Sequence, residues 1–278
     1  MHLWMSLRRG LTGAFTGGNP RPWGNAGWRH TLQYNKWRVN RYILPGQVCH
    51  VTHRCHDRAF LLKFARDRDA YRERLREALQ DSAVHLLTYT ITANHVHLLA
   101  VSDATAALAG MMHAVAGETA QAYNRRKGRS GAFWADRYHA TMVETGRHLW
   151  ACLRCIDLNM VPSGVMAHPA ERQWTGWHEL MGLRRRYRLL DLDQLLACLG
   201  EPSLDAFRSR YQPMVEDALR RRELPRQPQW TQSLAVGTEA FVRQAEGRLR
   251  TCGRRLRTVV EESAAGDWLL REAEPPYG

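Results

Sequence analysis

Residues 91–101 read Ile91-Thr92-Ala93-Asn94-His95-Val96-His97-Leu98-Leu99-Ala100-Val101, and the predicted fold is centred on them. The apolar run predicts a buried strand. Side chains alternate across a strand, so His95 and His97 lie on one face and Val96 on the other. Two imidazoles side by side on a rigid strand supply half of a metal site. The pair taken alone fits equally well with two unrelated polar residues near a turn.

The elements around this stretch predict a split β-α-β arrangement. Hydrophobic periodicity predicts strands over 47–54, 84–92, 95–101 and 133–143 and helices over 67–80 and 105–126. This order is that of a ferredoxin-like antiparallel sheet, which we expect to carry its helices on one face. Further helices are predicted over 146–160, 190–199, 203–223 and 239–250. The predicted fold class is therefore α+β with a helical C-terminal extension.

The charge of the chain favours a polyanionic partner. Its 278 residues carry a formal net charge of +13, and the pI is about 10.0. No apolar run is long enough to cross a bilayer, and no basic amphipathic helix with a bulky apolar face stands out. We therefore expect the partner to be nucleic acid and not a membrane.

The six cysteines stand at irregular positions, a pattern that is typical of a reduced, cytoplasmic protein. Cys49, His53 and Cys55 share one face of the first predicted strand. Their spacing permits a zinc site but lacks a paired Cys-x-x-Cys knuckle, so packing against the sheet is the favoured interpretation.

Several motifs in order resemble one family. They are His95-Val96-His97, Tyr123-Asn124-Arg125-Arg126-Lys127, Gly131-Ala132-Phe133-Trp134 with Arg137-Tyr138, and Ile156-Asp157-Leu158-Asn159 with His168-Pro169. Together they resemble the IS200-like single-strand DNA transposases of the Y1 HUH type, and most closely the branch of REP-associated tyrosine transposases. The resemblance covers residues 41–190. It implies a bacterial protein that is cytoplasmic and associated with the nucleoid when bound to DNA.

The resemblance implies a metal-assisted reaction on single-stranded or hairpin DNA that carries a palindromic repeat. In this family two histidines and a third polar ligand hold Mg²⁺ or Mn²⁺, which polarises the scissile phosphate. A tyrosine then attacks the phosphorus and forms a covalent 5′-phosphotyrosine intermediate. Carried over to this chain, the metal ligands are His95, His97 and Asn159. The family contains both monomers and homodimers.

The chain departs from the family at the nucleophile. Cys155 stands where the tyrosine is expected, one helical turn before Asn159. A thiol is a poor match for phosphorus and is shorter than a tyrosine, and cysteines are often inert and buried. Tyr138, on the predicted fourth strand, is a possible substitute. We expect a protein that keeps the fold and DNA binding but has weak or no strand transfer.

Basic residues mark the expected DNA contacts, and the alternative for them is a solvated loop. They are Arg54, Arg125, Arg126, Lys127, Arg129 and Arg137. Phe133, Trp134 and Tyr138 could stack on unpaired bases or pack in the core, and for Trp134 we favour packing.

The resemblance divides the chain into three segments. Residues 1–40 are predicted to be a disordered basic extension, residues 41–182 the HUH transposase-like catalytic domain, and residues 183–278 the helical, basic extension. Two further functions remain open. One is a non-catalytic DNA-binding derivative of the same fold, and the other is an RNA-binding module of ferredoxin-like fold, which lacks the aromatic strand signatures expected of such modules.

Overall fold

The structure is a computed structural model that describes residues 43–222, 227–251 and 257–273. The predicted basic extension over 1–40 lies outside the described residues. Residues 40–278 form one compact unit. No described helix has both the length and the apolar composition that a membrane span requires.

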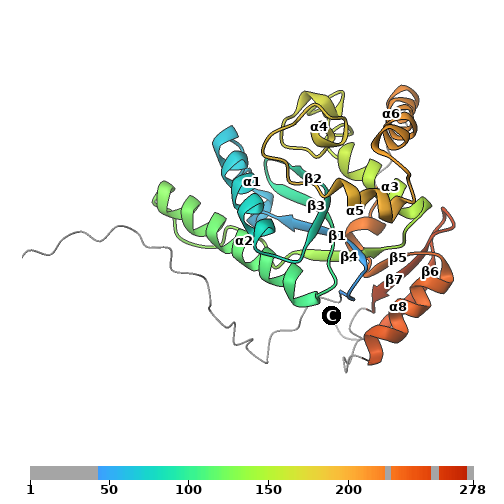
Figure 1. The fold of residues 1–278 in the computed structure, drawn as a ribbon. Coiled ribbons are helices and arrows are strands. Elements are labelled where there is room, and N and C mark those ends of the chain that lie inside the picture. Colours follow the sequence, from blue (N-terminus) through green and yellow to red (C-terminus); the bar gives the residue numbers. More distant parts are fainter. Residues whose placement is uncertain (1–42, 223–226, 252–256, 274–278) are drawn as a thin grey trace, which may run out of the picture. The chain divides into compact units, whose positions relative to one another are not determined.

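The first six main elements follow the predicted order (Figure 1). They are β1 (Val48–Arg54), α1 (Ala65–Gln80), β2 (His85–Ile91), β3 (His95–Val101), α2 (Thr105–Lys127) and β4 (His139–Val143). A short 3₁₀ helix, η1 (His56–Arg58), follows β1. The fourth strand begins six residues later than predicted, because Phe133 turns into the core and the chain makes only one bridge there, between Trp134 and Cys55.

The second half of the chain contains both helices and strands. The helices are α3 (Arg147–Asp157), η2 (Pro169–Glu171), α4 (Trp177–Leu180), α5 (Leu192–Leu199), α6 (Leu204–Arg221), α7 (Gln229–Gln232) and α8 (Glu239–Thr251). The strands are β5 (Ala235–Gly237), β6 (Thr258–Glu262) and β7 (Trp268–Glu272).

The strands form one seven-stranded sheet in the order β2-β3-β1-β4-β5-β7-β6. The first four pair antiparallel in ferredoxin-like order, as predicted. β5 then pairs parallel with β4, so the complete sheet is mixed. The C-terminal extension therefore differs from the purely helical prediction. Its three-residue β5 is too short to show a period of two in the sequence.

Helices cover both faces of the sheet and not one face, which corrects the expectation from the sequence. α1 and α2 lie side by side on one face and pack on Val96 and Leu98 of β3 (Figure 1). α3 and α5 pack on the opposite face, where Leu99 and Val101 lie. The central strands are apolar on both faces over most of their length, so both faces need cover. The second face also carries His95 and His97, and the site forms there.

Candidate metal and DNA-binding site

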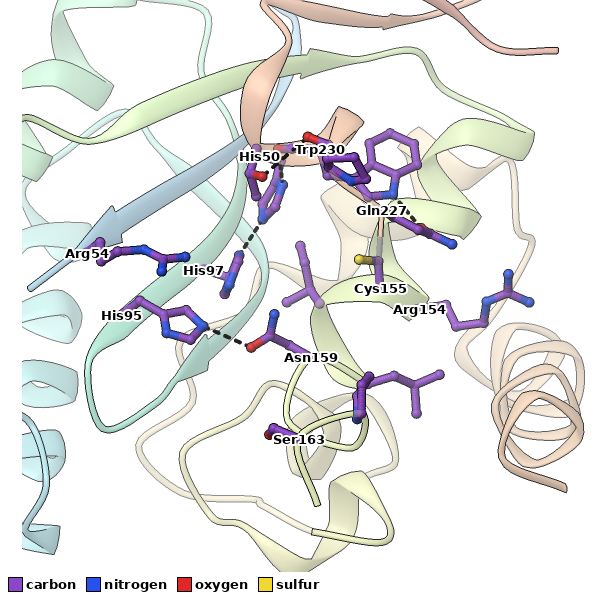
Figure 2. A pocket seen from close by; sticks show the side chains of 15 residues that line it. His50, Arg54, His95, His97, Arg154, Cys155, Asn159, Ser163, Gln227 and Trp230 are labelled. Carbon is purple, nitrogen blue, oxygen red and sulfur yellow. Dashed lines mark hydrogen bonds between the residues drawn. The ribbon is translucent and has the colours of Figure 1, made fainter. Parts of the chain in front are cut away.

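A pocket of about 400 Å³ opens between the α3 face of the sheet, the end of α3 and the segment that contains α7 (Figure 2). The sheet contributes His50, Arg54, His95 and His97, the end of α3 contributes Arg154, Cys155 and Asn159, and the α7 segment contributes Gln227 and Trp230. Strand register explains the first group, because β1 and β3 pair Thr52 with His97 and Arg54 with His95. The structure thus brings together the three ligands predicted from the sequence and Cys155.

His95 faces Asn159 across this pocket. Its Nε2 lies 3.0 Å from Asn159 Oδ1 (Figure 2). The other ring nitrogen, Nδ1, lies 2.7 Å from Asn94 Oδ1. Because Asn94 uses its Nδ2 to donate to the carbonyl of Arg58, its Oδ1 is an acceptor and His95 Nδ1 must donate. Burial lowers the pKa of His95 to about 4, so the ring is neutral at pH 7.

His97 has an unsatisfied nitrogen in the same place. Its Nδ1 lies 2.8 Å from His50 Nε2, and His50 Nδ1 lies 2.8 Å from the carbonyl oxygen of Trp230. His97 Nε2 is buried and has no hydrogen-bond partner among the residues that the structure describes. Burial lowers the pKa of His97 well below that of a free imidazole. A buried, unpartnered nitrogen is costly unless something binds it.

The donor set fits a divalent cation. Imidazole nitrogen and carboxamide oxygen are both ligands for such ions. His95 Nε2 and Asn159 Oδ1 lie 3.0 Å apart, close enough for one ion to contact both atoms. Within the described ranges, no group of three or more His, Cys, Asp or Glu side chains could hold a metal. This set contains only two such residues and needs the amide of Asn159.

The cysteine and histidine cluster on the opposite face packs against the sheet. Cys49 and Cys55 are fully buried. Burial raises the pKa of each thiol to about 12, which disfavours the thiolate that zinc requires. His53 stacks on Trp134 with 3.9 Å between ring centroids, and its Nε2 donates to the carbonyl of Asp136. Packing is therefore the interpretation that the geometry supports.

Cys155 lines the pocket, but its thiol is protonated at neutral pH. It lies on α3, and Figure 2 shows it between Trp230 and Asn159. Burial raises the pKa of this thiol to about 12, although the charge of Arg154 acts against the rise. The thiolate, and not the thiol, is the reactive nucleophile.

Tyr138 does not reach this pocket. It lies just before β4 with its side chain in the core beneath α1 and α2, on the other face of the sheet. Its ring meets the edge of His53 at 6.5 Å between centroids. The structure therefore gives the sequence-based idea of Tyr138 as a substitute nucleophile no support, because the sheet separates its hydroxyl from His95 and His97. Phe133 is also buried in that core.

The predicted basic residues lie at the end of β1 and in the segment from the end of α2 to Arg137. Arg54 is in the pocket, while Arg125, Arg126 and Lys127 end α2 and are exposed. Arg126 pairs with Asp67 at 2.5 Å. Arg129 donates to Asn124 Oδ1 and to the carbonyl of Ala132, so it shapes the loop.

This loop joins the basic residues to the pocket. The backbone N–H of Ala135 donates to the carbonyl of Arg54 at 2.9 Å, which fixes the loop at the end of β1. Arg137 is exposed two residues further on. The loop thus connects the end of α2 to Arg54 at the end of the central strand β1.

Several residues around the site were not predicted from the sequence. His50 could have been found, because it shares a strand face with Arg54. Trp230 contributes a backbone carbonyl, which no sequence pattern reveals. Two exposed aromatic residues were also missed, Phe60 at 66% and Phe64 at 51% relative exposure. Lys127 Nζ lies 5.5 Å from the centroid of the Phe64 ring.

A family model agrees with the resemblance seen in the sequence. The family model described as "Transposase IS200 like" matches residues 46–151. A solved structure of a REP-associated tyrosine transposase bound to a REP hairpin is 14% identical, with a TM-score of 0.44, and the match covers 56% of this chain and 92% of that chain. No curated protein matches the chain. Residues 46–151, which contain the two histidines of β3, thus match the IS200-like transposase family, and this confirms the resemblance predicted from the sequence.

Proposed function

We propose that this protein binds single-stranded or hairpin DNA with a palindromic repeat, and that a divalent cation, Mg²⁺ or Mn²⁺, is held beside it by His95, His97 and Asn159. The observation that carries the proposal is the buried Nε2 of His97, which has no hydrogen-bond partner among the described residues, in a pocket that also contains His95 and Asn159. The bound ion would act as a Lewis acid on a phosphate oxygen. A protein that binds such DNA would act in the bacterial cytoplasm and associate with the nucleoid.

The residues around the pocket would bind the DNA. Arg54 and Arg154 place positive charge in the pocket itself, where a phosphate would approach the metal ligands. The exposed cations at the end of α2 would add further contacts to phosphates. Phe64, with Lys127 against its ring, offers a surface on which an unpaired base can stack.

We further propose that strand cleavage is weak or absent. With a pKa of about 12, about one Cys155 thiol in 10⁵ is ionised at pH 7. A neutral thiol with no base assigned to it is a weak nucleophile for phosphorus. The protein then binds its DNA target without forming the covalent intermediate, as the non-catalytic alternative requires.

A labelled DNA hairpin with single-stranded flanks tests both parts of the proposal. We expect the wild-type protein to bind this DNA with Mn²⁺ present and to form no covalent adduct on a denaturing gel. The Cys155→Tyr variant should form a metal-dependent adduct, because the new phenol enters the same pocket as the ligands. Cys155→Phe is the matched control of similar size without the hydroxyl. Robust adduct formation by the wild-type protein would overturn the proposed loss of cleavage.

The RNA-binding alternative needs a separate measurement. If hairpin RNA of the same sequence displaces the DNA at equal or lower concentration, the preference for DNA is wrong. We expect the DNA to be displaced by unlabelled DNA hairpin at a concentration at least tenfold lower than by the RNA.

A further inference from the structure

We propose that His50 is a positioning residue, which acts with the backbone carbonyl of Trp230 to hold His97 in the tautomer that has its proton on Nδ1 and leaves Nε2 free for a cation. This inference rests on the proposed metal site and adds two residues to it. Neither touches the three ligand atoms that face the pocket. Figure 2 shows the three groups in a row, with hydrogen bonds running from Trp230 through His50 to His97.

The directions of these hydrogen bonds follow from the one group that cannot donate. A carbonyl oxygen only accepts, so His50 Nδ1 carries the proton in its 2.8 Å contact with Trp230. His50 is only 1% exposed, and a neutral imidazole is the form that such burial favours. A neutral ring with its proton on Nδ1 has an accepting Nε2.

The accepting Nε2 of His50 determines which ring nitrogen of His97 carries the proton. The contact between His50 Nε2 and His97 Nδ1 is 2.8 Å long and needs one proton between the two atoms. Because His50 Nε2 accepts, the proton belongs to His97 Nδ1. His97 is 5% exposed and neutral for the same reason as His50, so its Nε2 is unprotonated. This Nε2 is the buried nitrogen that lacks a partner among the described residues.

The Trp230 carbonyl, which accepts the hydrogen bond from His50, belongs to a well-packed segment. The indole of Trp230 is 1% exposed, and its Nε1 donates to Gln227 Oε1 at 2.6 Å. Thr141 Oγ1 lies 2.6 Å from the Ser233 carbonyl and 3.1 Å from the Trp230 carbonyl, so its one proton bridges these two carbonyls of the segment. A few residues on, the backbone N–H of Met142 donates to the carbonyl of Leu234, which ties this segment to β4. The carbonyl therefore stays in place when His50 is not there to bind it.

The ring orientation is fixed as well as the proton. The His50 and His97 rings are nearly parallel, with 16° between their planes and 5.0 Å between their centroids. Outer hydrogen-bond partners of this kind set the tautomer and direction of a metal-binding histidine. Trp230 lies outside residues 46–151, so the C-terminal part of this chain completes a site whose two histidines come from the family-matched part.

Nuclear magnetic resonance of the metal-free protein tests the tautomer directly. In protein labelled with ¹⁵N at histidine, long-range couplings between ring protons and nitrogens show which nitrogen is protonated. We expect His50 and His97 both to carry the proton on Nδ1 at pH 7. A proton on Nε2 of His97 would overturn the proposal, and this measurement needs neither a variant nor a metal.

Mn²⁺ binding by variants tests the consequence. His50→Leu removes the acceptor, so His97 is free to protonate Nε2, and we expect Mn²⁺ affinity measured by calorimetry to fall by roughly 10- to 100-fold. His50→Gln keeps an acceptor for His97 and a donor for Trp230, so it should stay within a few-fold of the wild type. His113→Leu, an exposed position on α2, is the control for loss of a histidine.

Two failures can be told apart. If His97→Ala binds Mn²⁺ as well as the wild type does, the proposed metal site is wrong. If His97→Ala loses binding but His50→Leu does not, the metal site stands and only the role of His50 is wrong. Should His50→Leu fail to fold, the wild-type tautomer and the His50→Gln variant decide the question.

Discussion

At the scale of single residues, the site depends on an uncharged oxygen donor beside two neutral imidazoles. Asn159 presents its amide to His95 at 3.0 Å and brings no charge to the pocket. A carboxylate at the same position would add a negative charge, and hard cations bind more tightly as the number of charged oxygen ligands increases. The amide would therefore limit how firmly the proposed ion is held.

Substitutions at Asn159 should separate the effect of losing the oxygen donor from the effect of adding a negative charge to it. We expect Asn159→Ala to lower Mn²⁺ affinity at least tenfold and Asn159→Asp to keep or raise it, both measured by calorimetry at pH 7. Ser163 lines the same pocket and provides the control, since Ser163→Ala should leave affinity nearly unchanged. Tighter binding by Asn159→Ala than by the wild type would contradict the assignment of the amide as a ligand.

The buried histidines also make stability depend on pH. The pKa of His50 and that of His95 are about 4 in the fold, below the ordinary 6.5, so the unfolded chain binds more protons between these values. The stability that these two histidines contribute should therefore be complete above pH 6.5 and be lost as the pH drops toward 4. Asp157, whose pKa burial raises to about 7, acts in the opposite direction and offsets part of the loss.

Urea denaturation at pH 7.5, 6.0 and 5.0 checks this dependence. The free energy of unfolding should decrease at each step, and the decrease should be smaller in His50→Gln, which lacks one of the titrating groups. A free energy that rises as the pH falls would show that the carboxyl of Asp157 outweighs the histidines.

At the scale of elements, α3 carries Cys155 and leads directly into Asn159, so its packing sets their positions. Leu149, Leu153 and Ile156 are almost fully buried against the sheet. We expect Leu153→Ala to destabilise the protein by about 2–5 kcal/mol, as measured by urea denaturation, because it leaves a cavity under the helix. An exposed site on α6, Arg220→Ala, should change stability by less than about 0.5 kcal/mol.

The elements also show which parts of the fold and site can be predicted from local sequence patterns. The positions of β3 and α3 are local consequences of alternation and helical spacing, which is why both elements are predictable and why His95, His97, Cys155 and Asn159 come to line one pocket. The short β5 and the hairpin of β6 and β7 were missed, because their strands have too few residues to display a period. The Trp230 carbonyl was also missed, since it lies 180 residues from its partner His50.

At the scale of the whole molecule, the positive charge should govern DNA affinity. We expect the double substitution Arg125→Ala/Lys127→Ala to weaken hairpin binding and to reduce the slope of log K against log salt concentration by up to about 1.4, or about 0.7 per lost phosphate contact. Arg243→Ala, an exposed residue of α8 paired with Glu239, is the control for loss of a cation elsewhere on the surface. An equal change in slope per lost charge for this control would show that the binding depends on net charge alone.

The position of Trp230 late in the chain has a consequence for synthesis. A polypeptide leaves the ribosome from its N-terminus, so β1 and β3 emerge long before the carbonyl that anchors His50. Until the segment through Leu234 has been translated and has docked on β4, the proton of His97 is not fixed. On this proposal a half-made chain would lack a finished ion site. A ribosome that stalls before this segment would release a product that has the histidine pair but not the carbonyl that anchors His50.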